Sequence, residues 1–247
     1  MQIPEKTTGS IVSSTSTQPQ SPSHDHIKSF QLRKGHFRGG RLAAYEALWP
    51  VYGLEYSSKT LLNFEQAFAR VAPTVLEIGF GMGTTTAQIA NENPAINYLG
   101  VEVYNAGVGS LMKHISDQGL TNIRAIEHDA FEVLRDMIPN NSLHGVHIYF
   151  PDPWSKARHH KRRLIQPQFI SLLLPKLQKG GYIHCATDWQ HYAEHMLAVF
   201  NATEELANAS THESGYAERP AWRPLTKFEN RGLKLGHGIW DLFYKLK

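Results

Sequence analysis

Short apolar runs alternate with amphipathic stretches through the middle of this 247-residue chain. Runs of consecutive apolar residues are typical of strands buried on both faces. Such runs occupy Val75–Ile78, Tyr98–Val103, Ile123–Glu127, Val146–Phe150 and Tyr182–Ala186. Helices are predicted between or after them at Thr84–Asn91, Ser110–Gln118, Gln168–Leu177 and Tyr192–Phe200. Pro175 is expected to bend or shorten the third of these helices.

Strands separated by helices favour a mostly parallel sheet wound on both faces, the doubly wound α/β class. A last apolar run, Ile239–Tyr244, has no helix after it, so we expect an antiparallel strand at the C-terminal edge of the sheet. In this class, ligands bind at the carboxyl ends of the strands. The candidate chemistry should therefore lie where the strands end.

Composition supports one large soluble domain over residues 29–247, since 41% of the residues are hydrophobic and none of the apolar runs is long enough to span a membrane. Residues 1–28 are rich in Ser, Thr, Gln and Pro and lack the apolar block of a secretory signal, which predicts a disordered extension. The single cysteine, Cys185, cannot close an intrachain disulfide. A cytoplasmic protein is expected, and the oligomeric state stays open, with a monomer as the working expectation.

The segment VLEIGFGMG runs from the first predicted strand into glycines at positions 79, 81 and 83. Such a turn lets the backbone approach a nucleotide-like ligand closely. A dinucleotide fingerprint needs its third glycine one place later, where this chain has Thr84. The spacing favours S-adenosylmethionine over NAD, although a tight structural turn would produce the same glycines.

An acidic residue lies in or just after each of the first four predicted strands: Glu77, Glu102, Asp129 and Asp152. Because these strand ends meet at one edge of a parallel sheet, we expect the carboxylates to gather there. Glu102 follows Gly83 at the distance expected of an acid that binds ribose hydroxyls. Asp129 would lie near the adenine, or would serve only as a helix N-cap.

The tetrapeptide Pro151–Trp154 (PDPW) carries the most chemistry, since two prolines restrict the backbone around Asp152. An acid and a tryptophan beside a methyl donor could hold a planar base by hydrogen bonds and stacking. Although the net charge is only +3, a basic run begins directly afterwards, with Lys156, Arg158, Lys161, Arg162 and Arg163. This run predicts contact with an RNA backbone, and a solvated loop is the alternative. The histidines show no ligand-like spacing, so no metal is expected.

Several segments together resemble the bacterial tRNA (guanine-N7-)-methyltransferases: LEIGFGMG, GVEV, HDAFEVL, FPDPWSKARHHKRR, ATDW and RPLTKFENRGLKLGHGIWDL. The similarity runs from about Ser29 to the C-terminus, and the pairing of PDPW with TKFE is highly specific. One departure is RGGRLAAYEALWP, which lacks the Thr-Lys-Gly-Gln sequence that the family pattern has after the arginine.

The resemblance implies a Rossmann-like class I methyltransferase fold, S-adenosylmethionine as cofactor, and methyl transfer to N7 of a guanosine in the variable loop of tRNA. Matching motif positions imply that Glu77, Gly79, Glu102, Asp129 and Asp152 bind the cofactor and that Asp152 is the active-site acid. They imply substrate contacts for Lys156, Asp188, Thr226, Lys227, Phe228 and Glu229. Structural salt bridges are the alternative for Asp188 and Glu229.

Three other functions stay open from the residues alone. A small-molecule methyltransferase would keep the cofactor acids and make the basic run incidental. An NAD-linked oxidoreductase is disfavoured by Thr84. A non-catalytic RNA-binding module would bind tRNA without methylating it.

Overall fold

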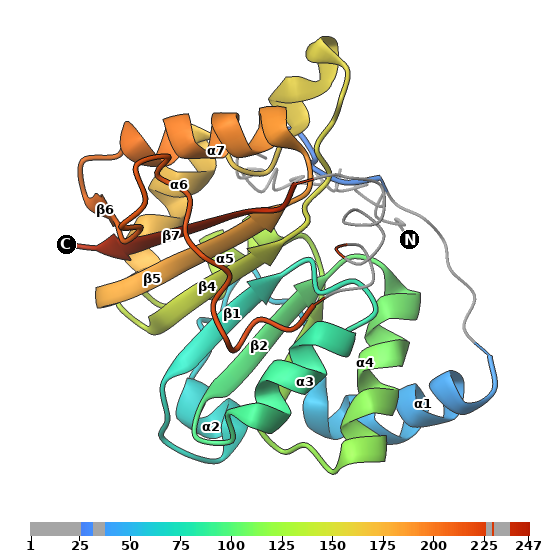
Figure 1. Ribbon diagram of the computed structural model, residues 1–247. Helices are drawn as coiled ribbons and strands as arrows, with labels where there is room; N and C mark the ends of the chain where they lie inside the picture. The colour runs from blue at the N-terminus through green and yellow to red at the C-terminus, as the bar shows by residue number, and fades with distance from the viewer. Residues whose placement is uncertain (1–25, 32–37, 226–228, 230–237) are drawn as a thin grey trace, which may run out of the picture.

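The structure, a computed structural model that describes residues 26–31, 38–225, 229 and 238–247, is built on a sheet of seven strands in the order β3-β2-β1-β4-β5-β7-β6 (Figure 1). The strands are β1 (Thr74–Ile78), β2 (Asn97–Glu102), β3 (Ile123–Glu127), β4 (Leu143–Tyr149), β5 (Leu177–Thr187), β6 (Leu206–Asn208) and β7 (Trp240–Leu246). Strands β1 to β5 pair in parallel. Strand β7 is antiparallel to both β5 and β6.

Helices cover both faces of the sheet. They are α1 (Gly40–Tyr52), α2 (Phe64–Phe68), α3 (Thr84–Glu92), α4 (Asn105–Gln118), α5 (Ala130–Asp136), α6 (Pro167–Leu173) and α7 (Gln190–Asn201), with 3-10 helices η1 (Ala157–Arg162) and η2 (Leu174–Lys176). Figure 1 shows α6 and α7 on one side of the sheet and α1, α3 and α4 on the other. In the described part of the chain, every helix is too short or too polar to cross a membrane.

Adjacent residues of the central strand serve opposite faces. Val75 belongs to a buried cluster with Leu111 and Ile115 of α4. Leu76, the next residue, belongs to a second buried cluster with Ile170 of α6 and Met196 of α7. A strand buried on both faces needs consecutive apolar residues, which is why the predicted runs were unbroken.

The predicted fold class is confirmed, including the antiparallel C-terminal strand. One difference is that the short β6 lies outside β7 and forms the edge of the sheet. The helix expected over Gln168–Leu177 ends at Leu173 and continues as η2, because Pro175 cannot donate a helical hydrogen bond. The sequence patterns do not predict α1 or α2, whereas α5 begins directly after Asp129, as the N-cap interpretation of that residue expects.

Helix α4 begins at Asn105, well before the predicted start at Ser110. Gly107 in its first turn argues against a helix on propensity alone. A Cβ atom at that position would lie 2.1 Å from the carbonyl oxygen of Gly81. The glycine therefore lets α4 pack directly against the turn that follows β1.

Candidate active site

Three glycines form the turn between β1 and α3, and each has a left-handed backbone. Their φ angles are 74° at Gly79, 56° at Gly81 and 71° at Gly83, a region that favours glycine. A side chain at Gly83 would lie 2.8 Å from Leu111, whereas positions 79 and 81 face open space. The turn thus packs on α4 at one end and leaves room for a ligand at the other.

Glu102, the last residue of β2, ties this turn to the start of α4. Its Oε2 accepts a hydrogen bond from the Gly81 N–H at 2.8 Å, and its Oε1 accepts from Val103 and Tyr104 at 2.7 and 2.9 Å. Burial raises the pKa of Glu102, the three backbone donors oppose this shift, and the Asp152 carboxylate adds to it. Oε1 has both of its lone pairs engaged, whereas Oε2 has a second lone pair with which Glu102 can still accept from a ligand hydroxyl.

Glu77 lies inside β1 and is only 3% exposed. Its Oε2 has no hydrogen-bond partner within the described residues. Burial raises its pKa to about 7, the nearby Thr86 hydroxyl opposes this shift, and the Glu102 carboxylate adds to it. A buried oxygen without a donor is costly, so this side chain offers an acceptor to a ligand that carries N–H groups or positive charge.

A pocket of about 210 Å³ opens at the carboxyl ends of β1 to β4. Gly79, Glu102, Asp129 and Asp152 line it from four different strand ends. The structure therefore brings three of the four predicted acids to one cavity. Glu77 lies behind the wall, one residue before Ile78, which does line the pocket.

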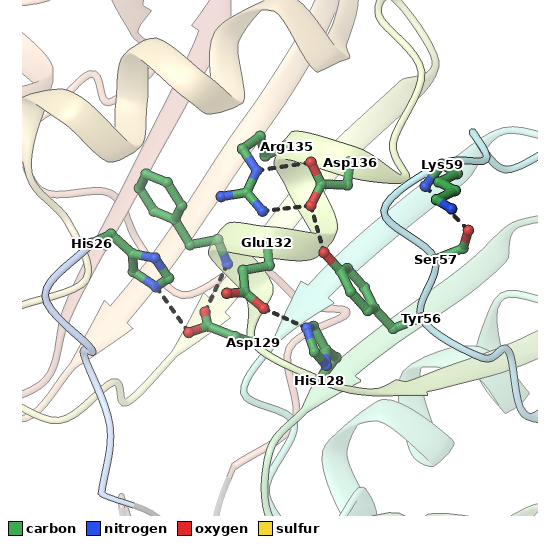
Figure 2. A network of polar contacts seen from close by, with 10 residues as sticks. His26, Tyr56, Ser57, Lys59, His128, Asp129, Glu132, Arg135 and Asp136 are labelled. Carbon is green, nitrogen blue, oxygen red and sulfur yellow. Dashed lines mark hydrogen bonds and ion pairs between the residues drawn. The ribbon is translucent and has the colours of Figure 1, made fainter. Parts of the chain in front are cut away.

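Asp129 caps α5 and faces the pocket at the same time (Figure 2). Its Oδ1 accepts a hydrogen bond from the Phe131 N–H at 3.0 Å, and its Oδ2 lies 2.8 Å from Nε2 of His26. The His26 ring also stacks on Phe131 with the ring centres 4.2 Å apart. The two interpretations of Asp129, helix cap and ligand acid, are therefore compatible, because each uses a different oxygen.

Figure 2 also shows the residues that pack around His128, which lines the pocket. Tyr56 stacks on His128 with ring centres 3.6 Å apart, and its hydroxyl donates to Asp136 at 2.5 Å. The Arg135 guanidinium pairs with Asp136 and holds the pKa of that carboxyl below its usual range. This packing fixes the orientation of the His128 ring in the pocket wall.

Residues 26–31, here called the N-terminal strap, run from Asp129 to the loop after β4. Ser29 and Phe30 line the pocket. Trp154 Nε1 donates to the Ser29 carbonyl at 3.0 Å, and Arg162 donates to the Lys28 and Phe30 carbonyls at 3.2 and 3.1 Å. Residues 26–28 had been assigned to a disordered extension, yet His26 and Lys28 contact the folded domain.

Asp152 is exposed and lines the pocket from the loop after β4. The backbone φ is 52° at Phe150 and 46° at Trp154, which is rare for bulky residues and marks local strain. Hydrogen bonds hold both sides of the loop: the Phe150 N–H donates to the Ala186 carbonyl, and Arg163 Nε donates to the Pro153 carbonyl at 2.9 Å. The Asp152 carboxylate is therefore carried by a restrained loop.

Comparisons with known proteins give the family. The structure resembles those of the aminoglycoside resistance methyltransferase NpmB1 and the 16S rRNA methyltransferase KamB, each with a TM-score of 0.50, 12% identity, and coverage of 74% of this chain and 92% of that one. This likeness supports the fold alone. A family described as "Putative methyltransferase" matches residues 71–242.

Sequence relatives are more specific. The tRNA (guanine-N(7)-)-methyltransferase of Bordetella pertussis is 52% identical and covers 96% of this chain and 92% of its own length. The protein of the same name from Burkholderia vietnamiensis is 54% identical and covers 90% of this chain and 86% of its own length. The chain belongs to the tRNA (guanine-N7-)-methyltransferase family. It is an S-adenosylmethionine-dependent enzyme, and the NAD-linked alternative is excluded.

The pocket of this methyltransferase fits its cofactor by its own chemistry. The open space at Gly79 lets a ligand approach the protein backbone closely, and Glu102, Asp129 and Asp152 present carboxylates to the pocket. Four carboxylates in and behind one pocket suit a ligand that carries a positively charged sulfur. Among the described residues, His, Cys, Asp and Glu form no cluster that could hold a metal ion.

The basic run of this methyltransferase contains exposed cations and cations that contact other parts of the protein. Lys156, Arg158 and Lys161 are exposed. Arg162 lies 3.9 Å from the centre of the Trp154 ring and holds the N-terminal strap. Arg163 is 2% exposed and contacts the Pro153 carbonyl and His191. The structure thus gives Arg162 and Arg163 internal contacts and leaves Lys156, Arg158 and Lys161 at the surface, where Arg158 Nε donates to His159 Nε2 at 3.3 Å.

Besides Lys156, two predicted substrate residues lie in described parts of the chain. Asp188 is half-buried and follows β5, beside the end of β4. Glu229 is buried, and its Oε1 lies 2.7 Å from Nη2 of Arg223. Glu229 therefore forms a salt bridge, which was the alternative to a substrate contact for this residue. Thr226, Lys227 and Phe228 lie outside the described residues.

Sequence reasoning missed His26 and Arg223. His26 meets Asp129 across 103 positions of sequence, and Arg223 meets Asp241 across 18. The sequence around each of these residues does not indicate its partner. The sequence has an arginine three positions before the TKFE motif, but nothing in its neighbours predicts that it is buried.

His26→Ala is expected to tighten the binding of S-adenosylhomocysteine by about fivefold, because it frees Asp129 Oδ2 at a gain of about 1 kcal/mol. Isothermal titration calorimetry of the variant checks this. His212→Ala, which changes an exposed histidine away from the pocket, is the control. Weaker binding by His26→Ala would instead make the histidine part of the binding surface.

Glu77→Gln tests the buried acid through pH. Because the pKa of Glu77 rises to about 7 in the folded protein, while an unfolded glutamate titrates near pH ~4.3, only the unfolded chain ionises between these values. As the pH rises through this window, the free energy of unfolding of the wild type should therefore fall by up to about 4 kcal/mol relative to that of the variant. Urea unfolding of both ligand-free proteins from pH 4 to 8 measures the difference. Parallel pH profiles would contradict the assignment.

Proposed function

We propose that the protein transfers the methyl group of S-adenosylmethionine to N7 of a guanosine in the variable loop of tRNA. The observation that carries the proposal is the position of Asp152. It shares a pocket with Glu102 and Asp129 and lies in the same loop as the exposed cations that begin at Lys156. The acids that we assign to the cofactor, the acid that we assign to the reaction and the cations that we assign to RNA phosphates thus lie at one edge of the sheet.

In this proposal the strand-end residues divide the cofactor among them. Asp129 accepts from the adenine amino group, and Glu102 accepts from the ribose hydroxyls. We assign Gly79 to the methionine end, and we assign to the Glu77 carboxylate, buried behind the pocket wall, the role of supplying negative charge toward the ammonium group. Asp152, at the end of the adjacent strand, lies toward the methyl group and the guanine.

The reaction requires positioning more than proton transfer. S-adenosylmethionine supplies a methyl group on a positively charged sulfur. Guanine N7 has an in-plane lone pair and no proton, so no general base is needed, and orientation of the two partners dominates the rate. The guanine becomes positive as the methyl group arrives, and the Asp152 carboxylate stabilises that charge.

The exposed cations of the basic run would bind the RNA backbone. Replacing Lys156, Arg158 and Lys161 together with Ala is expected to weaken tRNA binding. It should also reduce the slope of the logarithm of the binding constant against the logarithm of salt concentration by about 2–3, because fewer phosphate contacts form and fewer counterions are released on binding. Filter binding over a salt series measures the slope. A matched variant with Lys59, Lys179 and Lys245 replaced by Ala, all exposed and outside this loop, should keep the original slope.

A methyl-transfer assay tests the proposal. Purified protein is incubated with labelled cofactor and an unmodified tRNA transcript, and the product is cleaved at N7-methylguanosine to map the site. A second transcript carries 7-deazaguanosine at the mapped position, which removes the nucleophile. The proposal predicts one labelled guanosine in the first RNA and none in the second. Label in the second RNA, or transfer to a small metabolite with none to tRNA, would contradict it.

A further inference from the structure

Arg223 is the largest fully buried side chain in the described part of the protein. Its Nε and Nη2 donate to the two oxygens of Asp241, each at 2.8 Å. Nη2 also lies 2.7 Å from Oε1 of Glu229. One guanidinium therefore binds two carboxylates, one on β7 and one in the TKFE motif.

A chain of hydrogen bonds continues from this cluster to the pocket. His184 Nε2 lies 2.8 Å from Oδ1 of Asp241, and His184 Nδ1 lies 3.0 Å from the Tyr149 hydroxyl. Burial lowers the pKa of His184, although Asp241 opposes the shift, so the ring is neutral. A neutral ring that donates from Nε2 accepts from Tyr149 at Nδ1, so both ring nitrogens of His184 are satisfied.

The same cluster lies behind the loop of Asp152. The Arg223 guanidinium is 5.9 Å from the centre of the Tyr149 ring and 5.8 Å from that of Phe150. Both aromatic residues line the cofactor pocket, and Phe150 has the strained φ of 52° at which the chain turns toward Asp152. Arg223 thus contacts the carboxylate of one motif and the aromatic wall beside another.

Stability alone gives little reason for such a cluster. A buried ion pair costs much of its Coulomb energy in desolvation, and well-packed apolar residues are often as stable in its place. Three buried charges with directional hydrogen bonds instead define one arrangement of the groups that they join.

We propose that Arg223 is a positioning residue for methyl transfer, holding Glu229 and the Tyr149–Phe150 wall in one arrangement so that the guanosine site keeps its place relative to Asp152. The inference rests on the proposed function, since it assigns Glu229 to the guanosine side of the site. Arg223 itself touches neither the cofactor nor the guanine. Its effect on the reaction passes through Glu229 and Phe150.

The test compares Arg223→Lys, Glu229→Gln and the double variant. Lysine keeps the charge but loses the planar fork that binds two carboxylates. We expect each single variant to lower kcat for tRNA methylation at least tenfold, with the affinity for S-adenosylhomocysteine changed less than twofold. The double variant should be no slower than the slower single variant, because both changes break the same link.

Arg124→Lys is the matched control. Arg124 is also a buried arginine beside two aromatic rings. It lies on β3, at the edge of the sheet away from β7, and it donates to the carbonyls of Ala67, Thr121 and Ile123. It should lose thermal stability and keep its kcat per folded molecule. If Arg223→Lys does not fold, Asp241→Asn replaces it, because the amide keeps one acceptor for the fork.

The outcomes separate the two hypotheses. If the wild-type protein does not methylate tRNA, the proposed function is wrong. An active wild-type protein whose Arg223→Lys variant loses only stability, as Arg124→Lys does, overturns the positioning role. Rate losses in Arg223→Lys and Glu229→Gln that multiply in the double variant also overturn it, because the two residues then act independently.

Discussion

Asp152→Asn is expected to lower kcat for tRNA methylation by roughly 10²–10³-fold, the range found when a group that stabilises developing charge is removed from an active site. The amide keeps the size of the side chain and its place in the restrained loop, but it lacks the negative charge that opposes the forming guanine cation. Because Asp152 is exposed at the pocket mouth, the affinity for S-adenosylhomocysteine should change much less than turnover.

Single-turnover methylation at saturating tRNA and cofactor measures this loss, and calorimetry measures the affinity. Asp117→Asn is the control, since Asp117 is an exposed acid on α4 that pairs only with Lys113 among the described residues. Its rate should equal that of the wild type. Unchanged methyl transfer by Asp152→Asn would remove this residue from the chemistry, and a parallel loss of rate and affinity would make it a cofactor ligand only.

Gly107→Ala is expected to have the second largest effect. The new methyl group would lie 2.1 Å from the Gly81 carbonyl, so either α4 or the glycine turn must move. Overpacking of this kind costs about 1–3 kcal/mol, and movement of the turn also breaks the bond from Gly81 to Glu102. Cofactor affinity should fall about 10–100-fold, because Gly79 and Glu102 form two walls of the pocket.

Gly40→Ala is the control for this substitution. Gly40 also lies in the first turn of a helix, but its added methyl group would meet only the Lys113 side chain at 3.7 Å, an ordinary contact. This variant should keep the wild-type affinity and gain slightly in stability from the better helix propensity of alanine. Titration of S-adenosylhomocysteine into both variants decides the question. Equal affinities would mean that the turn absorbs the methyl group without disturbing the pocket.

The parts of this fold that sequence predicts well are those with a local cause. Consecutive apolar residues such as Val75 and Leu76 identify strands buried on both faces, and Pro175 shortens its helix as predicted. The start of α4 was misplaced because Gly107 has poor helix propensity, and its reason for being there is the distant Gly81. Local preference gave way to packing at that position.

The candidate site divides in the same way. Acids at strand ends can be located because parallel strands end at one edge, and three of them do line one pocket. The sequence does not predict which cations of the basic run are exposed, because Arg162 and Arg163 contact residues distant in sequence, Lys28 and His191 respectively. Charge in a sequence indicates a cation but not the surface on which it ends.

The most direct test of the account is a crystal structure of the protein with S-adenosylhomocysteine. The account predicts the adenine against Asp129, the ribose on Glu102, and the sulfur above Gly79 on the side that faces Asp152, with the guanosine side of the pocket open toward Lys156. A ligand bound elsewhere, or a sulfur atom that points away from Asp152, would contradict the assignment of these acids to one methyl-transfer site.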